Sequence, residues 1–225
     1  MNVKNYSLIA LPALIVLAPG IIWYQQTGDL TVYLSPEYAS QVPPGQLVYV
    51  LSKLLGLYAL SFIAWQLIAT LCTRLGIGSP RWRGRRHRWF GGFVVLLALA
   101  HSLLFVMAVS LRQGHLAWGL LLPDFRDFYH THLTFGLLGL WVLLAVVGAG
   151  VVRRRKPRSP SRWLHKAYWL AIVLIYLHSL AIGTESQSTA GLLFYGALGG
   201  IALVLFVAFL LNRFRQNRER MGYST

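Results

Sequence analysis

Four histidines in two apolar segments are the residues of this chain best suited to chemistry. His87 and His101 lie in one segment, and His165 and His178 lie in another. In each segment the first histidine stands at the basic edge and the second lies deep among apolar residues. A histidine inside a bilayer is costly unless it is paired or bound, so such residues mark a functional site. Two pairs on two segments indicate heme iron held between helices by neutral imidazoles.

The spacing of the histidines predicts how the pairs form. Fourteen residues place His87 and His101 about 21 Å apart along a helix, and thirteen place His165 and His178 about 20 Å apart. Both segments are expected to cross the membrane in the same direction, so His87 pairs with His165 and His101 pairs with His178. These distances suit two hemes stacked across a hydrocarbon core of about 30 Å.

Helical phase places both histidines on one face of the helix in the first segment, but not in the second. At about 100° per residue, fourteen steps return to within about 40° of the starting face, whereas thirteen miss it by about 140°. Either the second segment is irregular near its start, or His165 approaches from the loop, or only one heme is bound. The sequence leaves these three alternatives open.

Six apolar segments are predicted to position the histidines. They cover residues 8–24, 47–72, 89–111, 133–152, 164–182 and 190–211. Each is near or above the ~17–25 residues that cross a hydrocarbon core, and only 12% of the chain is charged. The first segment contains Pro12 and Pro19 but has no clear cleavage site, so we expect a retained helix. The prediction is an all-α, six-helix transmembrane bundle with heme held between the third and fifth helices.

The basic residues alternate between loops and predict the orientation of the bundle. Arginine and lysine gather after the second, fourth and sixth segments, whereas the other loops hold five of the six acids. The positive-inside rule then places both termini in the cytoplasm, and we expect a bacterial inner membrane. We expect residues 1–225 to form one integral membrane domain, with a heme-binding core at about 46–211 and a basic tail at 212–225. The net charge of +15 therefore reflects topology and contact with anionic lipid, and nucleic acid is not an expected partner.

Other residues near the histidines suit the same cofactor. Arg86, Arg88 and Arg162 flank the first histidine of each segment and are candidates to pair with heme propionates. His130 and His132 open the fourth segment on the outer side, where they either cap that helix or line an outer reaction site. A single cysteine excludes an internal disulfide, a multi-cysteine zinc site and a cysteine-ligated iron–sulfur cluster.

The two histidine segments resemble those of the ferric reductase-like transmembrane domain. The residues that carry the resemblance are Arg86-His87-Arg88 with His101, and Trp163-Leu164-His165 with His178. This family includes the membrane core of NADPH oxidases and ferric reductases, and the heme-binding membrane subunit of the bacterial methionine sulfoxide reductase system. The resemblance covers about residues 46–211 and implies six helices with b-type heme. It implies that His87 and His165 ligate an inner heme and that His101 and His178 ligate an outer one.

The resemblance implies a b-type cytochrome that moves single electrons across the membrane. No glycine-rich dinucleotide fingerprint occurs in the chain. We therefore expect electrons from a separate flavoprotein carrying FAD or FMN, or from quinol, and a periplasmic oxidoreductase is a candidate acceptor. Two alternatives stay open. One is a ferric or oxygen reductase acting at the outer heme, and the other is a heme-free six-helix transporter whose histidines relay protons or pack.

Overall fold

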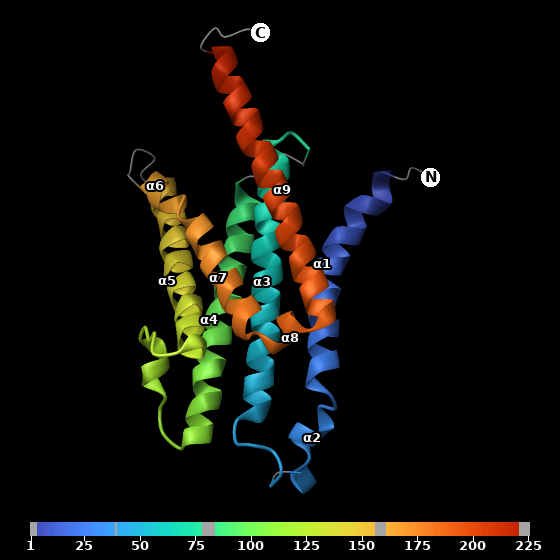
Figure 1. The fold of residues 1–225 in the computed structure, drawn as a ribbon, viewed down its shortest axis with the longest axis vertical. Helices are drawn as coiled ribbons and strands as arrows, with labels where there is room; N and C mark the ends of the chain where they lie inside the picture. Colours follow the sequence, from blue (N-terminus) through green and yellow to red (C-terminus); the bar gives the residue numbers. More distant parts are fainter. Residues whose placement is uncertain (1–3, 39, 78–83, 156–160, 221–225) are drawn as a thin grey trace.

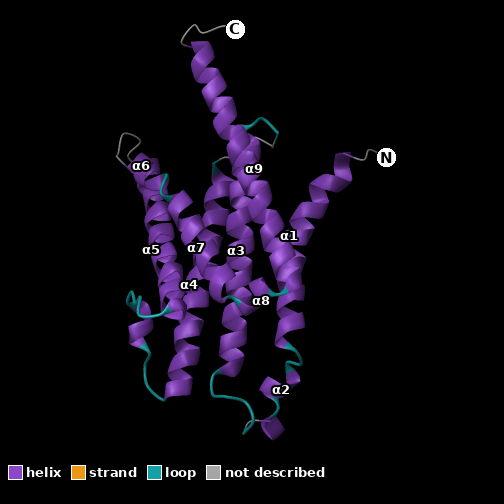
Figure 2. Ribbon diagram, viewed as in Figure 1, coloured by secondary structure: helices purple, strands orange, loops and turns teal. Residues whose placement is uncertain are grey.

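The described part of this chain is built of helices and loops (Figures 1 and 2). The computed structural model describes residues 4–38, 40–77, 84–155 and 161–220. The long helices are α1 (Lys4–Thr27), α3 (Gln46–Arg74), α4 (Arg85–Gln113), α5 (Phe128–Arg155), α7 (Tyr168–Ile182) and α9 (Thr189–Arg220). The short ones are α2 (Thr31–Leu34), η1 (Pro36–Tyr38), η3 (Trp118–Leu121), α6 (Ser161–His165) and α8 (Thr184–Gln187). No strand occurs in these residues, and the predicted all-α class is confirmed for them.

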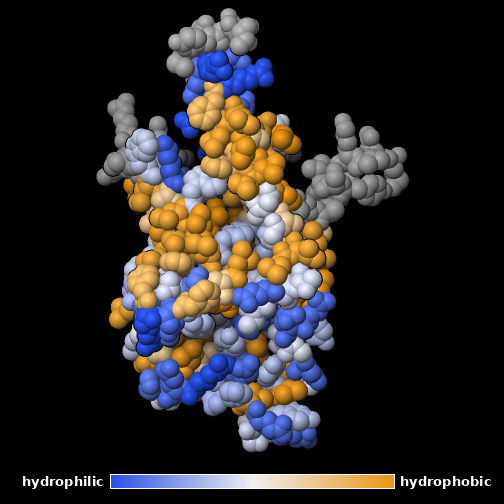
Figure 3. All heavy atoms as spheres, in the orientation of Figure 1, coloured by the Kyte–Doolittle hydropathy of each residue, from blue (hydrophilic) through white to orange (hydrophobic). Residues whose placement is uncertain are grey.

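Five stretches of helix in the described residues are long and apolar enough to cross a membrane. They are Gln46–Arg74, Arg86–Gln113, Phe128–Val152, Trp163–Ile182 and Thr189–Glu219. Large apolar side chains point outward from them, and Leu103 of α4 and Leu193 of α9 expose 64% and 71% of their surface. Figure 3 shows a broad apolar band below the polar C-terminal end of α9 and above a more polar end near α2. The chain is therefore an integral membrane protein in contact with lipid. A sixth crossing by α1 stays a prediction.

The arginine-bearing ends of α3, α4, α5 and α9 lie at one end of the bundle (Figure 1). The helices α3, α5 and α9 end there, and α1, α4 and α6 begin there. We call this the arginine-rich end. The α9 helix continues without a break to Arg220, into the predicted basic tail at 212–225.

The apolar segment predicted at residues 164–182 is divided between two helices. The first, α6, ends at His165, and the second, α7, begins at Tyr168. Between them the backbone N–H groups of Lys166 and Ala167 each donate to a carbonyl three residues earlier, at 3.0 Å. This is the hydrogen-bond pattern of a 3₁₀ turn, which changes the helical phase. The helix is therefore irregular near the start of this segment. This is the first of the three alternatives given above for the thirteen-residue spacing.

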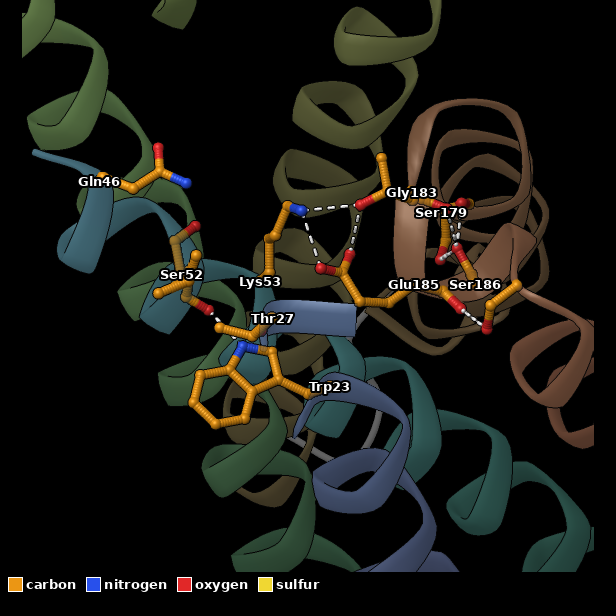
Figure 4. Close-up of polar contacts among 12 residues, drawn as sticks. Trp23, Thr27, Gln46, Ser52, Lys53, Ser179, Gly183, Glu185 and Ser186 are labelled. Carbon is orange, nitrogen blue, oxygen red and sulfur yellow. Dashed lines mark hydrogen bonds and ion pairs between the residues drawn. The ribbon is translucent and has the colours of Figure 1, made fainter. Parts of the chain in front are cut away.

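A buried ion pair fastens α8 to α3 (Figure 4). The Nζ atom of Lys53 lies 2.8 Å from Oε1 of Glu185 and donates to the hydroxyl of Thr184 at 2.7 Å. Oε2 of Glu185 accepts a hydrogen bond from the same hydroxyl at 2.8 Å. Glu185 is only 3% exposed, and a carboxylate at this depth is tolerated because both of its oxygens are paired.

We expect Lys53→Met to destabilise the fold by about 3 kcal/mol. This is the lower end of the range for removing one partner of a buried pair, because the Lys53 side chain retains 21% of its exposure. Chemical unfolding of the detergent-solubilised protein measures the effect. The matched control is Arg215→Gln, which breaks an exposed pair with Glu219 at 3.0 Å and should cost no more than about 0.5 kcal/mol. Equal losses in the two variants would contradict a structural role for the buried pair.

Candidate functional site

The structure brings the four histidines together in the predicted pairs. The ring centroids of His87 and His165 lie 6.4 Å apart with the planes at 80°, and those of His101 and His178 lie 6.3 Å apart with the planes at 65°. In each pair one imidazole comes from α4 and the other from α6 or α7. The turn after His165 lets two residues thirteen apart both face α4, which an unbroken helix would not allow.

The centroid separation in both pairs suits one metal ion between two imidazoles. Imidazole nitrogen binds first-row metals at about 2.0–2.1 Å, and each centroid lies roughly 1.1 Å behind its nitrogen, so two axial imidazoles have centroids about 6.3 Å apart. A direct hydrogen bond of about 2.9 Å between the rings would bring the centroids to about 5 Å. The observed separations of 6.3 and 6.4 Å match the first arrangement.

Backbone carbonyls orient the imidazoles of His101, His165 and His178. Nδ1 of His101 donates to the Ser52 carbonyl at 2.8 Å, and Nδ1 of His178 donates to the His132 carbonyl at 2.9 Å. Nδ1 of His165 donates to the Val146 carbonyl at 3.2 Å. A carbonyl can only accept, so the proton stays on Nδ1 and the unprotonated Nε2 is left on the other side of the ring. This tautomer is the form that binds a metal through Nε2.

Each of these three carbonyls precedes a glycine by four residues. The carbonyl residues and their glycines are Ser52 with Gly56, His132 with Gly136, and Val146 with Gly150. A β-carbon at Gly56 would lie 2.9 Å from Nδ1 of His101, and one at Gly136 would lie 2.6 Å from Nδ1 of His178. The missing side chains therefore give these imidazoles access to the helix backbone. At Gly150 the distance to His165 is 3.8 Å, so the contact is looser there.

Two cavities, each beside one histidine pair, lie between α3, α4, α5 and α7. The cavity at the arginine-rich end is lined by His87 and His165, and the other is lined by His101 and His178. The residues that line both cavities are Ile63, Val94 and Leu143. One aliphatic layer, with a side chain from each of α3, α4 and α5, therefore separates the two cavities.

The predicted arginines differ in their relation to the first cavity. Arg88 lines it together with Arg74 of α3, which was not among the predicted site residues. Arg86 is exposed in the first turn of α4. Arg162 lies in α6, but its side chain lies outside the described part of the structure. Arg74 and Arg88 are thus the described cations that can meet an anionic group in this cavity.

His130 and His132 open α5 in two different ways. The backbone N–H of His130 donates to Asp127 at 2.8 Å, and its ring Nδ1 lies 2.7 Å from the same carboxylate. The backbone hydrogen bond holds the pKa of Asp127 below its usual value, because it stabilises the ionised carboxylate. Asp127 therefore caps the helix. His132 has a different role, since its carbonyl orients His178.

Comparisons of the chain with protein families, with curated proteins and with solved structures find no match.

Proposed function

We propose that this chain is an integral membrane b-type cytochrome of the ferric reductase-like kind, which carries single electrons across the membrane. The observation that carries the proposal is the pairing of four histidines across two cavities, with centroids 6.3 and 6.4 Å apart. Successive ligands on α4 are about 21 Å apart along the helix axis, which suits two stacked hemes.

Heme is the cofactor that the residues lining the cavities fit. Within the described ranges, no cluster of three or more His, Cys, Asp or Glu side chains is placed to hold a metal ion. A pair of imidazoles is therefore sufficient only for an ion whose other ligands come from elsewhere, and a porphyrin supplies four of them. Aliphatic side chains such as Ile63, Val94 and Leu143 dominate the wall between the cavities, as an apolar macrocycle requires.

The residues that line the cavities would have different roles: the histidines bind iron and the arginines pair with charged groups. His87 and His165 would hold one heme, and His101 and His178 would hold the other, with Nδ1 hydrogen bonds keeping the imidazoles in place. Arg74 and Arg88 would pair with propionates at the arginine-rich end. The bound heme would supply reversible one-electron reduction of its iron.

The proposal includes an orientation and partners. The arginine-rich end faces the cytoplasm of a bacterial inner membrane, in agreement with the positive-inside rule. A separate flavoprotein with FAD or FMN, or membrane quinol, supplies the electrons. The acceptor lies on the opposite side, where a periplasmic oxidoreductase is the candidate partner.

A second candidate function is reduction of a small acceptor at the outer heme. A further cavity, lined by His115, Asp124 and His130, shares Leu120 and Leu133 with the cavity of the outer histidine pair. This places a polar vestibule next to the proposed outer heme. Steady reduction of ferric chelates by the purified protein alone would favour this function over transfer to a protein partner.

The heme-free transporter finds less support in the geometry. Transporters of this type hold their substrate where broken helices face each other at the middle of the membrane. The break between α6 and α7 lies instead at the arginine-rich end (Figure 1). The imidazole separations are also wider than a direct proton relay requires.

Heme content per polypeptide tests the proposal. We expect two b hemes in detergent-purified protein from heme-supplied cells, measured by pyridine hemochrome and reduced-minus-oxidised spectra. One heme would restrict the site to His101 and His178, which lie deeper in the bundle. No heme would contradict the cytochrome assignment and favour the transporter.

A further inference from the structure

The cavity beside the proposed outer heme has the size and the lining of a small-molecule site. Its volume is about 420 Å³, within the ~300–1,000 Å³ that is usual for such sites. Its apolar walls include four leucines, Leu116, Leu120, Leu122 and Leu133. Two of them also line the cavity of the His101–His178 pair. We call this cavity the outer vestibule.

A buried hydroxyl fixes the rim of the outer vestibule to α5. Thr134 is 2% exposed, and its Oγ1 accepts from the backbone N–H of Asp124 at 2.8 Å and donates to the carbonyl of the same residue at 2.7 Å. The Asp124 carboxylate accepts from the backbone N–H of Arg126 at 3.1 Å and lies 3.0 Å from its Nε. The Arg126 guanidinium is therefore held at the vestibule, which it lines.

His130 lies between this guanidinium and a carboxylate. Its Nδ1 lies 2.7 Å from Oδ2 of Asp127, and its Nε2 lies 2.6 Å from a terminal nitrogen of Arg126. A guanidinium only donates and an ionised carboxylate only accepts. The ring is therefore neutral in this arrangement, with its proton on Nδ1 and a lone pair on Nε2. This basic nitrogen is directed at Arg126, which lines the vestibule together with His130.

The surroundings of His130 allow it to exchange a proton with water outside the membrane. The titratable and charged groups that face the ring or share the vestibule with it belong to Asp124, Arg126, Asp127, Tyr129 and His115. The side chain of His130 is 23% exposed, so water reaches it. A proton on Nε2 would displace Arg126, which keeps its contact with Asp124. The imidazolium would keep Asp127 as its ion-pair partner.

We propose that the outer vestibule binds small neutral organic acceptors whose oxygen takes up a proton on reduction, as in quinones and nitroxides, and that His130 donates this proton through Nε2. The inference rests on the second candidate function and names the substrate class of that site. The leucine walls favour an uncharged molecule, and His130 supplies a general acid next to it.

Each step of this reduction balances in electrons and protons. The acceptor receives one electron, supplied through the outer heme, and its oxygen forms a bond to the proton from Nε2. His130 returns to the neutral form that accepts from Arg126, and it regains a proton from outer water. A ferric chelate takes up the electron alone, so its reduction does not need His130.

The substitution His130→Gln tests the proposal with two acceptors. The measurement is anaerobic stopped-flow reoxidation of protein reduced with stoichiometric dithionite. A small nitroxide takes up one electron and one proton, whereas ferric EDTA takes up only the electron and is the matched control. We expect the variant to react about 100-fold more slowly with the nitroxide, the lower end of the range for a general acid, and at an unchanged rate with ferric EDTA. The wild-type rate with the nitroxide should fall as the pH rises, because the donor must be protonated, and the variant should lose this dependence.

Nitrogen-15 histidine NMR of the reduced, diamagnetic protein gives a readout that needs no turnover. The His130 signals, assigned by their loss in His130→Gln, should show the Nδ1–H tautomer in the neutral form. The Nε2–H tautomer, equal losses with the two acceptors, or no loss with the nitroxide would overturn this inference while leaving the cytochrome intact. A wild-type protein that reduces neither acceptor would overturn the second candidate function as well, and one without heme would overturn the proposed function itself.

Discussion

Replacing His178 by alanine is expected to reduce the heme content from two per polypeptide to one, with the chain still folded and inserted. The imidazole of His178 faces His101 at a centroid distance of 6.3 Å. Alanine removes a proposed ligand and leaves His101 as the remaining member of the pair. His101→Ala should have the same effect, because the two rings serve one site.

Pyridine hemochrome spectra measure the loss, and gel filtration in detergent checks that the variants remain folded. His115→Ala is the matched control, since His115 lies in the loop after α4 and outside both pairs. The variants His87→Ala and His165→Ala should each remove the other heme. Unchanged heme content in both the His101 and the His178 variants would contradict the assignment of these residues as ligands.

The pairing of the histidines was predictable because it depends on local helix geometry. The rise of an α-helix is fixed, so spacings of fourteen and thirteen residues determine the separation of His87 from His101 and of His165 from His178. The break after His165 was predictable only as one of three alternatives. Its exact place depends on how α6 and α7 pack, which periodicity does not report.

The residues that orient the imidazoles were missed, although the sequence contains a signal for them. Gly136 and Gly150, which give His178 and His165 access to the α5 backbone, are fourteen residues apart. This is the spacing of His87 and His101, and matching intervals on neighbouring helices indicate residues that meet at the same two levels.

The ion pair between Lys53 and Glu185 could not be predicted from the sequence. The two residues are 132 positions apart, and charge patterning assigned Glu185 to an outer loop. The structure buries it to 3% exposure in the pair with Lys53. Long-range pairing of this kind depends on the tertiary fold that brings α8 within reach of Lys53 on α3, for which no local pattern exists.

Gly136→Ala is expected to remove the heme at the His101–His178 pair. The added β-carbon would lie 2.6 Å from Nδ1 and 2.8 Å from Cγ of His178, far inside the ~3.5–4.0 Å of a normal contact. Both atoms belong to a rigid ring, which cannot move away without breaking the 2.9 Å hydrogen bond to the His132 carbonyl. We expect one heme per polypeptide from the hemochrome spectrum, as for His178→Ala.

Gly150→Ala is the matched control for this substitution. It makes the same change on the same helix, but its β-carbon would lie 3.8 Å from Nδ1 of His165, an ordinary contact. Alanine is also favoured over glycine in a helix by about 1 kcal/mol, so neither variant weakens α5 by its intrinsic propensity. A loss of heme in Gly136→Ala but not in Gly150→Ala would therefore report the position of His178. Two hemes with unchanged spectra in Gly136→Ala would show that the ring does not need its hydrogen bond to the α5 backbone in order to bind iron.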